Sequence, residues 1–116
     1  MTDNAIFIYQ DMIGRGFVPS NMVYNSLVNS LSLGGELQRA TDVLREMILR
    51  GGVPDFITYK TLVDGLCKEG KGEQARHLLH QFREKDLALD RISYRKLLNL
   101  LQPWIDTVDA KNSKIS

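Results

Sequence analysis

The sequence predicts an all-α protein, a solenoid built from stacked copies of one helical hairpin. A tyrosine recurs at an interval of 35 residues, at Tyr24, Tyr59 and Tyr94. Other positions follow the same interval: Leu27, Leu62 and Leu97; Leu31, Leu66 and Leu101; Ala5, Ala40 and Ala75. A period of about 20 to 50 residues is typical of proteins in which one supersecondary unit is repeated and each copy buries its apolar face against its neighbours.

The unit at residues 21–55 has the pattern of two helices. Apolar residues at helical spacing predict a first helix over 21–33 and a second over 36–50. Gly34 and Gly35 separate the two helices, because glycine suits the left-handed conformation that ends a helix. Pro54 then breaks the chain before the next unit.

The pattern continues on both sides of this unit. It predicts helices near 56–69 and 71–85, a third first helix from Arg91 that Pro103 ends, and one upstream helix near 3–14. The repeat array is therefore expected over residues 1–102, as a half repeat at 1–20, repeats at 21–55 and 56–90, and a partial repeat at 91–102. Residues 103–116 are expected to form a C-terminal cap, with Trp104 packed over the end of the array, and a disordered polar tail after Asp109.

The helix near 3–14 carries apolar residues, such as Ile8 and Met12, on more than one face. Terminal repeats normally need a polar outer face. We therefore expect this helix either to meet the rest of a longer protein or to form a homodimer or bind a protein partner.

Bulk composition restricts the classes of function. The net charge of +1, from 15 basic and 14 acidic residues, does not suit a protein that coats nucleic acid by charge alone. No apolar run approaches the ~20 residues that cross a bilayer, and no signal or transit peptide is evident. A single cysteine, Cys67, excludes an intramolecular disulfide framework. No phosphate loop, nucleophile elbow or catalytic carboxylate cluster is present, so no enzyme activity and no cofactor are expected.

The string from Pro54 to Lys71, PDFITYKTLVDGLCKEGK, closely resembles the pentatricopeptide repeat consensus. The spacing of 35 residues also separates the chain from tetratricopeptide repeats of about 34 and ankyrin repeats of about 33 residues. The resemblance covers about residues 1–102 and implies a right-handed α-α superhelix of helical hairpins, tetratricopeptide-like. It further implies sequence-specific binding of single-stranded RNA, one base per repeat, in a mitochondrion or chloroplast, for RNA processing, stability, editing or translation.

The resemblance also assigns site residues. The second residue of a unit packs on a base, while the fifth residue and the residue after the proline read it. This gives Met22 with the pair Asn25 and Asp55, which resembles a uracil-preferring combination. The remaining positions are Ile57, Lys60 and Asp90 in the next unit, Ile92 and Arg95 in the partial unit, and Lys68 near the phosphate backbone. Lys60 departs from the usual residue types, so no base is assigned to it.

Each of these residues also has a structural interpretation, which the sequence leaves open. Asp55 and Asp90 precede helices and suit N-caps, Asn25 could be solvated, and Met22, Ile57 and Ile92 could belong to the core. Cys67 with His77 and His80 is a weak metal or catalytic pattern, because no further ligand or orienting residue is evident. A short helical module that binds protein and has little affinity for RNA is the alternative function.

Overall fold

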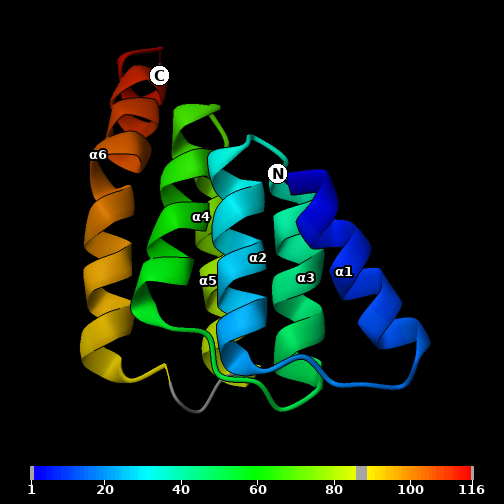
Figure 1. Ribbon diagram of the computed structural model, residues 1–116. Helices are drawn as coiled ribbons and strands as arrows, with labels where there is room; N and C mark the ends of the chain where they lie inside the picture. The colour runs from blue at the N-terminus through cyan, green and yellow to red at the C-terminus, as the bar shows by residue number, and fades with distance from the viewer. Residues whose placement is uncertain (1, 86–88, 116) are drawn as a thin grey trace. The chain divides into compact units, whose positions relative to one another are not determined.

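The computed structural model describes residues 2–85 and 89–115, with side-chain surroundings for 6–84 and 89–103. The described chain is all-helical and contains no strand (Figure 1). Its elements are α1 (Thr2–Gly14), α2 (Asn21–Leu33), α3 (Leu37–Leu49), α4 (Phe56–Lys68), α5 (Gly72–Lys85) and α6 (Arg91–Ile115). This confirms the predicted all-α class, and α2 begins and ends at the predicted residues.

Four of the helices, α1 to α4, end in the same type of turn. At the end of α2, the N–H of Glu36 donates to the carbonyl of Leu31 at 2.9 Å, and Gly35 between them has a φ of 82°. The same bond, from the residue after a left-handed glycine back to the last turn, closes α1, α3 and α4: Phe17 to Met12, Gly52 to Met47, and Lys71 to Leu66. Each turn therefore satisfies carbonyls that a helix end would otherwise leave without partners.

The chain divides into two compact units, Met1–Leu62 and Val63–Ser116. In the first unit, α2 packs against α3 and α1 packs against α2, where the rings of Tyr9 and Tyr24 meet edge to face at 5.8 Å. In the second unit, α5 packs against α6. The periodic leucines supply the core, because Leu31, Leu66 and Leu101 are at most 1% exposed. Among the described residues, no helix combines the length and apolarity that a bilayer crossing requires.

The structure differs from the prediction at the C-terminus. Pro103 lies inside α6, which continues to Ile115, whereas the sequence pattern predicted a helix end at Gln102 and a disordered tail after Asp109. Proline removes one backbone donor but fixes φ near −65°, a helical value. A helix can therefore continue through it with one hydrogen bond fewer. The predicted packing of Trp104 lies outside the residues whose side chains are described.

A pair of glycine substitutions should separate backbone strain from packing. Nothing lies within 4 Å of a Cβ built at Gly51 or Gly14, but Gly51 has a φ of +83° and Gly14 ends α1 without a positive φ. We expect Gly51→Ala to lower the free energy of unfolding by about 1–2 kcal/mol. Gly14→Ala should be neutral or stabilising by up to about 1 kcal/mol, because alanine favours a helix. Urea titrations of both variants would measure this, and equal effects would contradict the assigned turn.

Candidate nucleic-acid interface

Three exposed apolar side chains lie at the same place in successive first helices. Met22, Ile57 and Ile92 are each the second residue of their helix, in α2, α4 and α6. Their side chains are 76%, 63% and 68% exposed, so they do not belong to the interhelical core. Each of these exposed apolar side chains is one on which a flat ligand such as a base can pack.

The acidic residues before α4 and α6 act as N-caps. Oδ1 of Asp55 accepts the N–H of Thr58 at 2.7 Å, and Oδ1 of Asp90 accepts the N–H of Ser93 at 2.7 Å. Hydrogen bonds from the backbone and hydroxyl of Ser93 lower the pKa of Asp90, helped by the N–H of Ile92 and the charge of Lys96. Both carboxylates are exposed. Because an ionised carboxylate has two acceptor oxygens, capping leaves each one able to accept a further hydrogen bond.

Asn25 is held by the last residue of its own repeat and by a residue of the following repeat. Its Oδ1 accepts the backbone N–H of Asp55 at 3.2 Å and the hydroxyl of Thr58 at 2.8 Å. Thr58 is fully buried at 0% exposure. We call these three residues the Asn25 latch. The latch rules out the interpretation of Asn25 as a merely solvated side chain, and it joins both members of the predicted reading pair.

The sequence did not lead us to expect Thr58 among the site residues. The signal was present, because a threonine between residues of a buried helical stripe must find a hydrogen-bond partner for its hydroxyl. The nearby Asn21 has a similar role, since its Oδ1 accepts the N–H of Val53 at 3.0 Å. Two asparagines of α2 thus organise the backbone that leads into α4.

Lys60 and Arg95 occupy the register of Asn25 in the next two units, at intervals of 35 residues. Both side chains are exposed. Ammonium and guanidinium groups donate hydrogen bonds and accept none, so neither residue can form a latch of the Asn25 type. Lys68, the last residue of α4, is also exposed. The three cationic site residues therefore differ chemically from the site at Asn25.

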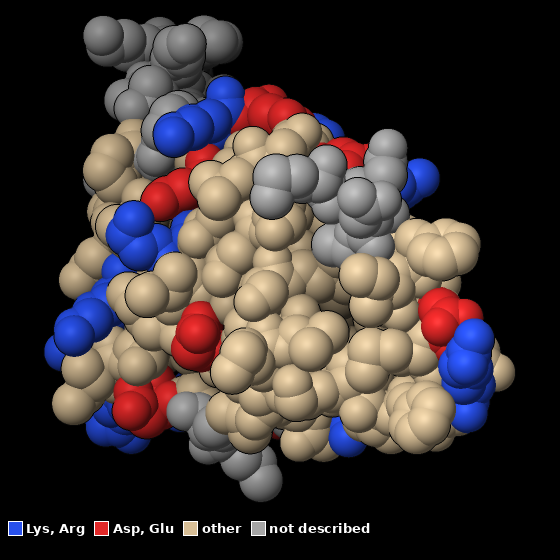
Figure 2. All heavy atoms as spheres, viewed as in Figure 1, with Lys and Arg blue, Asp and Glu red and all other residues tan. Residues whose placement is uncertain are grey.

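The first helices differ in charge. The sequence of α2 contains no charged residue, and its surface in Figure 2 is free of blue and red. By contrast, α6 has Arg91, Arg95 and Lys96 in its first two turns, and Lys and Arg gather over it in Figure 2. The candidate site at Asn25 is thus neutral, and the candidate site on α6 is cationic.

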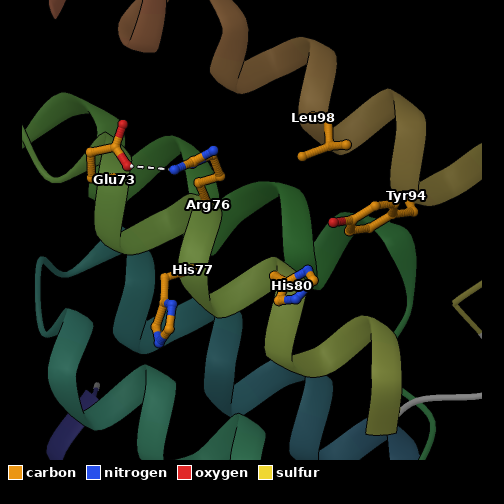
Figure 3. Close-up of a pocket in the computed structure, with 6 residues that line it drawn as sticks. All are labelled: Glu73, Arg76, His77, His80, Tyr94 and Leu98. Carbon is orange, nitrogen blue, oxygen red and sulfur yellow. Dashed lines mark ion pairs between the residues drawn. The ribbon is translucent and has the colours of Figure 1, made fainter.

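A separate groove lies between two helices of the second compact unit. This groove of about 460 Å³ between α5 and α6 is lined by Glu73, Arg76, His77, His80, Tyr94 and Leu98, none of them a predicted RNA-binding residue (Figure 3). The Arg76 guanidinium pairs with Glu73 at 3.2 Å. Figure 3 shows His80 and Tyr94 facing the same space, while the His77 ring turns away from Tyr94.

The groove has a simple origin in the repeat. Tyr94 and Leu98 are only half-buried, although the side chains one unit earlier, Tyr59 and Val63, are each 1% exposed. A second helix would follow the first in a whole unit, but here α6 continues past Pro103. The groove is therefore an uncovered face of the repeat, and it carries no arrangement typical of catalysis.

The metal and nucleophile interpretations gain no support. Among the described residues, no group of three or more His, Cys, Asp or Glu could hold a metal ion. Cys67 is buried at 1% exposure, and burial, with the nearby Asp64, raises the pKa of its thiol. A raised pKa keeps the thiol protonated, whereas a nucleophilic cysteine needs the thiolate.

The hairpins and the common register of the exposed first-turn side chains define a helical-repeat module. The sequence pattern of the PPR repeat family matches residues 19–68 and 54–101, which together cover more than half of the chain. The chain therefore belongs to the PPR (pentatricopeptide) repeat family. No curated protein matched it. Members of this family are generally non-catalytic, typically bind RNA and are commonly organellar.

Proposed function

We propose that this chain binds single-stranded RNA along its first helices and reads one uracil with Asn25 and Asp55. The Asn25 latch is the observation that carries this proposal. A side chain that selects a base must be held in one orientation before the base arrives, because ordering it on binding costs affinity. Asn25 is held in this way by Asp55 and Thr58.

The latch also sets the chemistry that the pair presents. With Oδ1 of Asn25 engaged, the amide offers its two N–H donors, and the exposed carboxylate of Asp55 offers an acceptor. The pairing edge of uracil has an N3–H donor flanked by carbonyl acceptors. Cytosine has an acceptor at N3. This atom and the Asp55 carboxylate would be two acceptors facing each other, with no hydrogen between them. The exposed Met22 and Ile57 are suited to pack on the faces of bases.

The expected affinity is low. Stacking and hydrogen bonding supply about 1–3 kcal/mol per base, so two or three repeats supply roughly 4–8 kcal/mol before the cost of immobilisation. Dissociation constants weaker than micromolar follow. We propose that the module acts where additional contacts add to its affinity for RNA. Its role would be in organellar RNA processing, stability, editing or translation, in a mitochondrion or chloroplast.

A protein-interaction module is the second candidate, and α1 favours it. Phe7 and Ile8 on α1 are 71% and 57% exposed, and Phe17 and Val18 after it are 62% and 58% exposed. Clustered exposed apolar residues are typical of surfaces that bind another protein. A homodimer or a partner that packs on α1 would cover them.

Titration of a short oligouridine, oligocytidine and oligoadenosine, with a deoxyuridine strand, tests the RNA proposal. We expect uridine to bind about tenfold more tightly than the other bases, a difference of about 1.4 kcal/mol. Asp55→Asn should remove this preference, because asparagine still caps α4 but no longer offers a charged acceptor to N3–H. Asp42→Asn, at an exposed carboxylate on α3, is the matched control. Absence of saturable binding up to millimolar RNA would contradict the proposal.

A further inference from the structure

We propose that Arg91 and Arg95 of α6 form an anchor for RNA phosphates that binds without regard to base identity. This inference rests on the proposed RNA-binding function. It gives α6 the role of holding the strand, which is separate from the reading of a base at Asn25.

The two arginines lie on one face of α6. They are four residues apart, so they stand about 6 Å apart along the helix axis, a separation comparable with that of successive phosphates in an extended strand. Both are exposed, whereas Leu97 and Leu101, at 0% exposure, face the core. The exposed Ile92 lies beside them at the register of Met22. A nucleotide packed on Ile92 would therefore place its phosphates near the arginines.

The fold gives no reason for this pair of charges. Two like charges four residues apart destabilise a helix by a few tenths of a kcal/mol, and the first turn of a helix favours acidic residues. The first turn of α6 has no acidic residue. No described residue forms an ion pair with Arg91 or Arg95, whereas Arg39 and Arg76 on the second helices, and Arg50 at the C-cap of α3, each pair with a glutamate. The α6 arginines are thus exposed cations that are available to bind an external anion.

Phosphate, and not a base edge, fits these groups. Arg95 takes the register of Asn25, but a guanidinium cannot accept the hydrogen bonds that orient Asn25. An arginine that reads a base also needs a fixed orientation, and none of its described neighbours supplies one. Arginine binds phosphate oxygens through paired N–H donors over a range of positions.

The test measures RNA affinity against salt for the whole chain and for the double variant Arg91→Gln/Arg95→Gln. Each phosphate contact in a single strand contributes about 0.7 to the slope of log K against log salt. We expect the double variant to lower the magnitude of this slope by about 1.4 with oligouridine, while the ratio of uridine to adenosine affinity stays unchanged. The control is Arg39→Gln/Arg76→Gln, which removes the same charge from second helices and should leave the slope as it is.

An NMR titration of the labelled chain with the same oligonucleotides separates the two proposals. Oligouridine should shift the side-chain signals of Arg91 and Arg95, and oligoadenosine should shift them equally. If these signals move while those of Asn25 do not, the anchor stands and the base-reading proposal fails. If Asn25 responds to uridine and the α6 arginines stay unchanged, the anchor is wrong. The anchor is also wrong if the shifts of the Arg91 and Arg95 signals depend on the base. It is equally wrong if the control variant lowers the salt slope as much as the double variant of α6 does.

Discussion

Replacing Leu31 with alanine is expected to lower the free energy of unfolding by about 2–5 kcal/mol, the range for leucine in a close-packed core. Leu31 is 0% exposed, and it lies where α1, α2 and α3 line a common cavity. Removing its branched end leaves a space that the surrounding helices fill only in part. Because a domain of this size has a total stability of about 5–15 kcal/mol, this one change removes a large share.

Leu33→Ala is the control for this prediction. Leu33 lies on the same helix and has the same side chain, but it is 81% exposed. We expect its replacement to change the stability by no more than about 0.5 kcal/mol. Urea unfolding followed by circular dichroism would compare the two variants with the unsubstituted chain. Similar midpoints for Leu31→Ala and Leu33→Ala would show that the repeat has been placed in the wrong register.

The register of the repeat could be predicted because it depends on short-range chemistry. Each turn requires a glycine where φ is positive, and each first helix requires a leucine at a fixed distance from its tyrosine. These requirements recur every 35 residues, so independent series confirm one another. The bounds of α2 follow directly from Ser20, which caps it by accepting the N–H of Val23, and from the glycines at its end.

Contacts between successive repeats could not be predicted in the same way. Asn25 and Thr58 are 33 residues apart, and their hydrogen bond depends on how α2 meets the start of α4. Hydrophobic periodicity carries no information on such a bond. Likewise, Met22 and Ile57 fit a helical apolar pattern, and only the packed structure shows that they point to solvent.

The prediction that Pro103 ends the helix was wrong for a different reason. The rule that proline ends a helix takes into account only a local penalty of about 3 kcal/mol. The outcome depends on whether the residues beyond it gain more as a continued helix than as a second helix folded back. In α6 they continue the helix, and Tyr94 stays half-buried as a result. Whether the helix continues therefore depends on the residues beyond Pro103 and not on the proline alone.

The Asn25 latch should also contribute measurably to stability. We expect Asn25→Ala to cost about 1–3 kcal/mol, because it leaves the buried hydroxyl of Thr58 and the N–H of Asp55 without their acceptor. Asn29→Ala is the matched control one turn later. Oδ1 of Asn29 is buried and has no hydrogen-bond partner among the described residues, so its removal should be near neutral or stabilising.

A double-mutant cycle with Thr58→Val isolates the bond itself. Valine has nearly the shape of threonine without the hydroxyl, so the double variant no longer buries an unpaired donor. We expect the costs of Asn25→Ala and Thr58→Val to be non-additive by about 1 kcal/mol. Additive costs would mean that the hydroxyl and the amide do not depend on each other.

The Thr58→Val variant also connects stability to recognition. It keeps both N–H donors of Asn25 but removes one of the two bonds that orient the amide. If orientation before binding matters, this variant should bind oligouridine more weakly although every atom assigned to contact the base remains. The expected loss is up to about tenfold, since ordering one side chain costs about 0.5–1.5 kcal/mol. Unchanged affinity would show that Asn25 selects uracil without help from the latch, or does not select it.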